Sequence, residues 1–206
     1  MEEQKKLKKF YIFPVLYVLS VYMVLTNIFI EEEGLFSTLI FLSPFITGIL
    51  NIILCICCCK PQYHDIMITS AAITKYCMVP FFTIGGIFTA GSFISSLMPI
   101  PFMFIVGTSI GFILCITGWL IVAFGSPYTI SYIVLSQREG RTSKGMAALH
   151  IISQFFFIMD VIDVICLSFR AKRNIKMSVA VIIFICVSFI SIIALFLFLL
   201  LQVITG

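Results

Sequence analysis

The sequence predicts an all-α protein: a polytopic helical bundle in a membrane, with five to six transmembrane helices and a cytoplasmic N-terminus. First, 61% of the residues are hydrophobic and only 11% are charged, whereas charged residues make up about a quarter of soluble domains. Second, several apolar runs reach the ~20 residues needed to cross a bilayer. Third, the basic residues form short clusters between these runs, where membrane orientation explains them. We therefore expect one transmembrane domain over residues 1–206, with the lipid bilayer as its partner and no nucleic acid.

The first apolar run covers residues 10–30 and is expected to be a retained transmembrane helix. A signal peptide is the competing interpretation, but its apolar core is shorter and is followed by small residues at a cleavage site. This run instead meets three glutamates at residues 31–33. Basic residues favour the cytoplasmic side, so the lysines before the run predict a cytoplasmic N-terminus and external glutamates. These lysines are Lys5, Lys6, Lys8 and Lys9.

The second crossing is expected over residues 35–59, which end in a cluster of cysteines. Its members are Cys55, Cys57, Cys58 and Cys59. The cluster has three interpretations: fatty acylation at the membrane surface, a soft-metal site shared with His64, or plain apolar residues. Adjacent cysteines on a helix point in different directions, which is poor geometry for one ion. The third interpretation is favoured, and no metal or cofactor is expected.

Residues 61–76 mix polar and apolar side chains and include His64, Asp65 and Lys75. Charged groups are costly in the hydrocarbon core. The segment is therefore expected at the cytoplasmic interface, before the chain enters the membrane again at Cys77.

Residues 77–125, named here the glycine hairpin, contain no ionisable side chain except two cysteines. Two prolines near residue 100 divide the segment into two predicted transmembrane helices, because backbone at membrane depth must satisfy its own hydrogen bonds. Small residues allow helices to approach closely in lipid, and here they recur on one side of each helix. The glycine hairpin is therefore predicted to be the packing centre. Its predicted packing residues are Gly86, Ala90, Gly107, Gly111, Gly118 and Gly125.

Residues 146–169 form an amphipathic segment with two interpretations. If it spans the membrane, the basic cluster at residues 170–176 falls outside, against the positive-inside rule. If it lies at the surface, or enters and leaves on one side, every basic cluster is cytoplasmic. A central Asp costs about 2.5–3.5 kcal/mol and each large apolar residue returns about 0.3–0.6 kcal/mol, so insertion energy does not decide. Charge bias favours five crossings plus one amphipathic helix, with residues 177–204 as the last crossing.

The polar face of this amphipathic segment is the candidate ligand site. It consists of His150, Gln154, Asp160 and Asp163. Ionisable groups at membrane depth are expensive and tend to bind ions, relay protons or hold a ligand. One alternative is a helix that lies flat, with its carboxylates facing water among the lipid headgroups. Another is that the polar residues are buried and form hydrogen bonds with a purely structural role.

Catalysis is not expected from this sequence. Residues 107–111 match Gly-x-Ser-x-Gly, but that motif needs a strand–turn–helix elbow and here lies within a predicted helix. A pairing of Ser109 with His150 would also need a water-filled pocket and an oxyanion hole that no residue pattern indicates. The glutamates at residues 31–33 are interpreted as a solvated acidic loop.

Two stretches, GWLIVAFGSPYTISY at residues 118–132 and GMAALHIISQFFFIMDVIDVI at residues 145–165, carry a resemblance. Over residues 75–172 the chain resembles a family of uncharacterised bacterial multi-span membrane proteins, known only as a domain of unknown function. The resemblance implies a bacterial cytoplasmic membrane and no particular reaction.

Two functions remain open at this point. The first is a small solute or ion transport component, or an accessory subunit of a transporter, as the polar face indicates. The second is a non-catalytic interaction protein, an immunity or regulatory factor that contacts another membrane protein subunit through the small-residue faces.

Overall fold

The computed structural model describes residues 10–30 and 34–205, and over them the chain is helical with no strand. The helices are α2 (Ile12–Ile30), α3 (Leu35–Cys57), η1 (Pro61–Tyr63), α4 (His64–Ser95), α5 (Met103–Phe124), α6 (Pro127–Arg138), α7 (Lys144–Ser153), α8 (Met159–Arg170) and α9 (Ile175–Thr205). The predicted all-α class is confirmed. The N-terminal lysines and the glutamates at 31–33 lie outside the described residues.

Four of the described helices are long and apolar enough to cross a membrane. They lie within Leu35–Cys57, Pro61–Ser95, Met103–Phe124 and Ile175–Ala194, and Ile12–Asn27 is a shorter apolar helix. Such helices are typical of a membrane-associated protein. The number of crossings and the side of the N-terminus stay predictions.

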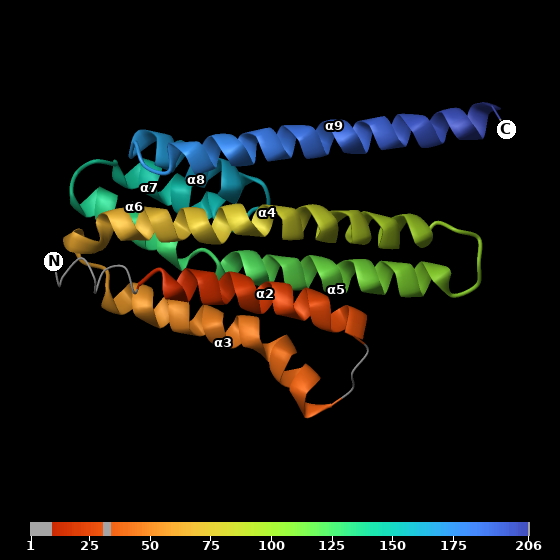
Figure 1. Ribbon diagram of the computed structural model, residues 1–206, viewed down its shortest axis with the longest axis horizontal. Coiled ribbons are helices and arrows are strands. Elements are labelled where there is room, and N and C mark those ends of the chain that lie inside the picture. The colour runs from red at the N-terminus through yellow and green to blue at the C-terminus, as the bar shows by residue number, and fades with distance from the viewer. Residues whose placement is uncertain (1–9, 31–33, 206) are drawn as a thin grey trace.

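The long helices run side by side, and α6, α7 and α8 gather at one end, near the N-terminus (Figure 1). This end, where α3 finishes and α4 and α9 begin, is named here the basic end. It holds every described Lys and Arg except Lys75: Lys60, Arg138, Arg141, Lys144, Arg170, Lys172, Arg173 and Lys176. Arg173 pairs with Asp65 at the start of α4, and Arg170 donates to the Arg141 carbonyl over 3.0 Å. These contacts hold the loops of this end together.

Helix α4 is the central element and contacts α2, α5, α6, α8 and α9. It runs without interruption through the segment expected at the interface, and twelve residues between His64 and Val79 are buried. Residues 61–76 are therefore largely buried within the protein near the basic end, and their position relative to the membrane interface stays a prediction. Polar residues of this segment are shielded because α6, α8 and α9 pack over them. Tyr76 is bonded to Ser178 on α9 over 2.7 Å, and His64 to Ser136 on α6 over 3.0 Å.

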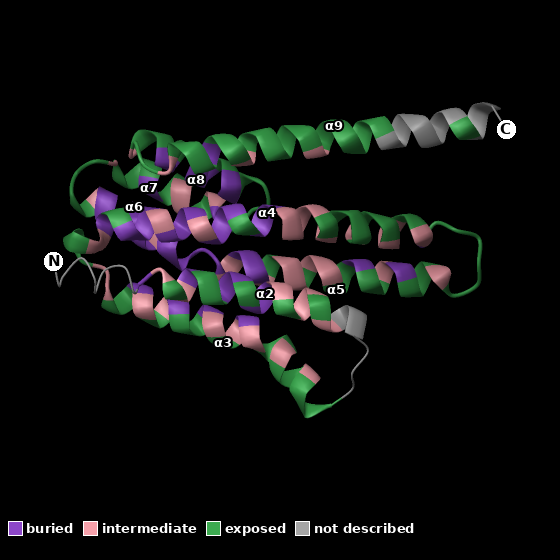
Figure 2. Ribbon diagram, viewed as in Figure 1, coloured by how far each residue is buried: buried purple, intermediate pink, exposed green. Residues whose placement is uncertain are grey.

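Burial is concentrated in the half of the bundle near the basic end (Figure 2). The largest described core cluster joins α4 and α6 there, around residues such as Met67, Ile68 and Tyr128. In the glycine hairpin, large side chains such as Ile87, Phe88 and Phe104 are exposed instead. The packing centre is thus displaced toward the basic end from its predicted position, because α6 and α8 cover only that half of α4.

Within the glycine hairpin, Gly107 and Gly111 lie where α5 crosses α4. A Cβ added at Gly107 would lie 2.6 Å from the Ser92 carbonyl oxygen, and one at Gly111 would lie 2.8 Å from the Phe93 ring. Only glycine permits this backbone approach.

The remaining predicted packing residues are in looser surroundings. A Cβ at Gly118 would lie 3.3 Å from the Phe157 ring, and one at Gly125 would lie 3.3 Å from Thr74. A Cβ at Gly86 would meet no atom within 4 Å, and Ala90 is exposed. Gly86 and Ala90 therefore make no close packing contact within the described chain.

Residues 146–169 form two helices rather than one. Helix α7 ends at Ser153, the chain reverses, and α8 begins at Met159 and returns to the basic end (Figure 1). The reversal includes Ile158 in the left-handed region, with φ 68°. The expected continuous helix is wrong, and the chain enters and leaves at the same end. This α7–α8 hairpin turns the two polar faces toward each other, so that they satisfy hydrogen bonds that one straight helix would expose to lipid.

Candidate functional site

Lys75 and Asp160 form a buried ion pair at the junction of α4, α5 and α8. Lys75 Nζ lies 2.9 Å from Asp160 Oδ2, and each side chain is only 2% exposed. The ammonium also donates to Ser126 Oγ over 2.9 Å and to the Val122 carbonyl over 3.3 Å. An ammonium has three donors, so each has an acceptor.

Local breaks in the helices supply the partners of this pair. Helix α5 ends at Phe124 and α6 begins at Pro127, a residue favoured in the first turn because it lacks an N–H. The break leaves Ser126 facing Lys75. Asp160 lies in the first turn of α8, where Oδ1 accepts the Val161 N–H over 2.8 Å. The helix dipole favours a carboxylate at this position.

A second polar group bridges the two arms of the α7–α8 hairpin. Asp163 on α8 contacts the His150 ring on α7 through Oδ1, and its Oδ2 accepts from Gln154 Nε2 over 2.6 Å. Burial raises the pKa of the Asp163 carboxyl above its usual value, while the bonds from His150 and Gln154 act in the opposite direction. The Gln154 amide oxygen is buried and has no hydrogen-bond partner among the described residues.

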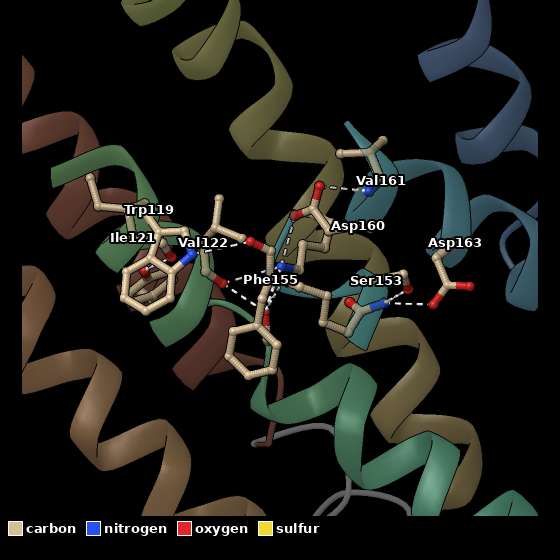
Figure 3. Close-up of polar contacts among 12 residues, drawn as sticks. Trp119, Ile121, Val122, Ser153, Phe155, Asp160, Val161 and Asp163 are labelled. Atoms are coloured by element: carbon tan, nitrogen blue, oxygen red, sulfur yellow. Dashed lines mark hydrogen bonds and ion pairs between the residues drawn. The ribbon is translucent and has the colours of Figure 1, made fainter. Parts of the chain in front are cut away.

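The two groups are linked through Ser126, and Figure 3 shows the polar contacts around Asp160 and Asp163. The Ser126 hydroxyl accepts from Lys75 and lies 3.1 Å from the Gln154 carbonyl oxygen. These contacts lead from Asp160 and Lys75 through Ser126 to the backbone of Gln154, and the Gln154 side chain binds Asp163. At the tip of the hairpin, the Trp119 indole donates to the Phe155 carbonyl over 3.1 Å (Figure 3).

A cavity of about 150 Å³ opens at the basic end between α6, α7 and α8. Six of its nine lining residues carry polar or basic groups: Tyr132, Ser136, Arg141, Thr142, His150 and Arg170. The other three, Ile133, Leu167 and Ala171, are apolar. His150 belongs both to this lining and to the contact with Asp163. The imidazole thus connects the cavity with the buried network.

Comparison with known proteins gives one match. The model described as "Family of unknown function (DUF6652)" matches residues 5–174. The chain belongs to this family. No curated protein and no solved structure matches the chain.

The DUF6652 region includes α2 to α8 and therefore every residue of the buried network. It ends one residue before α9 begins. The resemblance to a family of unknown function is confirmed, and the matched region is longer than residues 75–172. The family description names no reaction, ligand or organism.

In this DUF6652 protein the four polar residues singled out from the sequence come together. His150, Gln154 and Asp163 contact one another, and Asp160 lies on the same side of the hairpin, paired with Lys75. Sequence reasoning missed Lys75 and Ser126. The available signal was the charge balance, since two carboxylates at membrane depth need a cation and Lys75 lies next to the apolar glycine hairpin.

Other candidates lie apart from the network. Ser109 is exposed on α5 and forms no described contact with His150. The cysteines are unpaired, and among the described residues no three His, Cys, Asp or Glu side chains converge as metal ligands.

Proposed function

We propose that this DUF6652 protein is a multi-pass protein of a bacterial cytoplasmic membrane, with its basic end and N-terminus in the cytoplasm. The gathering of the described Lys and Arg side chains at one end supports this orientation. In this arrangement α2, α3, α4 and α9 each cross once. Helices α5 and α6 together make the remaining crossing, and the α7–α8 hairpin enters and leaves on the cytoplasmic side.

We further propose that the protein is a small component of a transport system that moves protons or a small cation. The observation that carries this proposal is the Lys75–Asp160 pair, whose two charges are almost completely buried. Charged groups at membrane depth are costly and are kept mainly for function. His150 lines the cavity and contacts Asp163, which supports an entry point for protons from the cytoplasmic water.

The network can couple proton entry to movement of the α7–α8 hairpin. A proton that reaches Asp160 removes the negative charge opposite Lys75. Removing one partner of a buried ion pair costs about 3–5 kcal/mol, because the other charge is left uncompensated. Protonation therefore weakens the attachment of α8 to α4, and release of the proton restores it.

The experiment uses the full chain in lipid vesicles that contain a pH-sensitive dye. A potassium diffusion potential drives protons inward, and the internal pH is followed. The intact protein is expected to acidify the vesicles faster than protein-free vesicles, and Asp160→Asn is expected to abolish the difference. Asp65→Asn is the matched control, because it makes the same change at an exposed carboxylate on α4 outside the network. Equal rates with and without the intact protein would overturn the proposal.

A second candidate function is the non-catalytic membrane interaction protein. It is supported by the outer surface of α4, where an added Cβ at Gly86 would meet no atom within 4 Å and Ala90, on the same face, is exposed. Helices approach closely through such residues in lipid, so this face suits a helix of another subunit.

A further inference from the structure

The cavity at the basic end has the composition of an anion site. Two arginines and three hydroxyl groups line it, together with His150. We propose that this cavity binds a phosphate group, carried either by an anionic lipid headgroup or by a small soluble phosphate. The proposal does not require proton movement through the buried network, although His150 belongs to both sites.

The Arg170 guanidinium is held against the backbone of Arg141, and both arginines line the cavity. Arg170 Nη2 donates to the Arg141 backbone carbonyl over 3.0 Å, which ties the end of α8 to the loop before α7. Arg141 forms a salt bridge with Glu139 through Nε, and Arg170 has no carboxylate within salt-bridge distance among the described residues. A guanidinium presents several N–H donors in a plane, which matches the oxygens of a phosphate.

The deeper lining supplies hydrogen-bonding groups rather than negative charge. Tyr132 and Ser136 are buried on α6, and Thr142 lies in the loop beside Arg141. The one nearby buried carboxylate, Asp163, is already engaged by His150 and Gln154. A phosphate in the cavity would therefore meet donors on its inner side and guanidinium groups on its outer side.

The size and position of the cavity further restrict the kinds of ligand that it can bind. Its volume of about 150 Å³ is below the ~300–1,000 Å³ of pockets for drug-sized molecules, so it suits a compact anionic group. Among the described residues, the basic end around it carries eight basic side chains but only two exposed acidic ones, Asp65 and Glu139. Basic pockets between helices on the cytoplasmic side of a membrane are typical sites for anionic headgroups.

The first experiment measures binding of inorganic phosphate to the full chain in neutral-lipid nanodiscs at constant ionic strength, with the melting temperature as readout. Phosphate is expected to raise the melting temperature in a saturable manner. Arg141→Gln and Arg170→Gln are each expected to weaken the apparent affinity about tenfold, as loss of a charge-assisted hydrogen bond predicts. Lys144→Gln is the matched control, because it removes the same charge from the same end but outside the cavity.

The second experiment tests the lipid as the source. The chain is purified from membranes of equal parts phosphatidylglycerol and phosphatidylcholine, and the retained lipids are measured by mass spectrometry. Preferential retention of phosphatidylglycerol, lost in Arg141→Gln and kept in Lys144→Gln, identifies a headgroup as the ligand. A response to inorganic phosphate alone identifies a soluble phosphate.

Three results would overturn the assignment. One is the absence of both a phosphate response and lipid preference. Another is equal weakening by Lys144→Gln and Arg141→Gln, which indicates diffuse attraction to the basic end. The third applies if Arg170→Gln fails to fold. In that case, normal phosphate binding by both Arg141→Gln and Thr142→Val would show that phosphate does not bind in the cavity.

Discussion

Lys75 has the most unusual surroundings of the described charged residues. Its ammonium is enclosed by one carboxylate, one hydroxyl and one backbone carbonyl from three different segments. Burial removes the water that solvates both charges, and only complete pairing offsets this loss. The stability of the bundle therefore depends less on the presence of either charge than on each buried charge having its partner.

This balance gives a prediction for a mutant cycle. Lys75→Met alone should lower the free energy of unfolding by about 3–5 kcal/mol, because Asp160 is left buried without a cation. The double variant Lys75→Met/Asp160→Asn should recover at least half of that loss, since Asn keeps an acceptor for the Val161 N–H. The free energy of unfolding of both variants is measured by titration with a denaturing detergent, with circular dichroism as the readout.

The control for the cycle is Lys144→Met, which changes an exposed lysine. If the double variant were as unstable as Lys75→Met alone, this would contradict the idea that charge balance determines the stability of the bundle. Recovered stability without recovered proton flux would separate the folding role of the pair from its proposed transport role.

At the scale of elements, the small residues of the glycine hairpin fall into two groups. Some contact a neighbouring helix, and others are exposed. Gly107 lies against the backbone of α4, whereas Gly86 faces open space. Both belong to the same predicted set, because periodicity identifies a face of a helix but not the neighbour that covers it.

Substitution by leucine should distinguish the two positions. Gly107→Leu must displace the Ser92 backbone, and overpacking of this kind costs about 1–3 kcal/mol or more. Gly86→Leu should leave the melting temperature equal or higher, because leucine also favours helix formation. Melting in detergent measures both, and equal destabilisation would mean that α4 packs through its outer surface as well.

In the second candidate function the same Gly86→Leu variant gives a further result. It would fold normally and yet lose the partner subunit, which chemical cross-linking of intact membranes detects.

At the scale of the whole molecule, the α7–α8 hairpin determines the topology. It returns the chain to the basic end, so the loops before α7 and after α8 lie on the same side (Figure 1). The pairing of Arg173 with Asp65 holds the second loop against the start of α4.

Labelling of single cysteines tests the proposed orientation. In a chain whose native cysteines are replaced, cysteines at Thr142 and Lys172 should react with an impermeant maleimide only after the cells are permeabilised. A cysteine at Leu97, in the exposed loop at the opposite end, should react in intact cells and serves as the positive control. Labelling of the Lys172 site from outside would indicate a sixth crossing and contradict the hairpin arrangement.

The sequence by itself determined the all-α class, the apolar helices and the polar side chains on α7 and α8. These features depend on composition, run length and helical period, which are properties of neighbouring residues. Even the close approach at Gly107 and Gly111 followed from the spacing of small residues. The charge pattern allowed residues 146–169 to enter and leave on one side, but the sequence did not indicate where they reverse, because no Gly or Pro interrupts their apolar and polar pattern.

Only the tertiary structure decided where the charges meet. Lys75 and Asp160 are 85 residues apart along the chain, and nothing local to Lys75 separates an interfacial lysine from a buried one. The folding of α6 and of the α7–α8 hairpin over α4 removes water from Lys75 and supplies its acceptors. The energetic cost of a charge in a membrane protein, and the strength of its interactions, depend on whether water, lipid or protein surrounds it. Tertiary packing determines which of these surrounds Lys75.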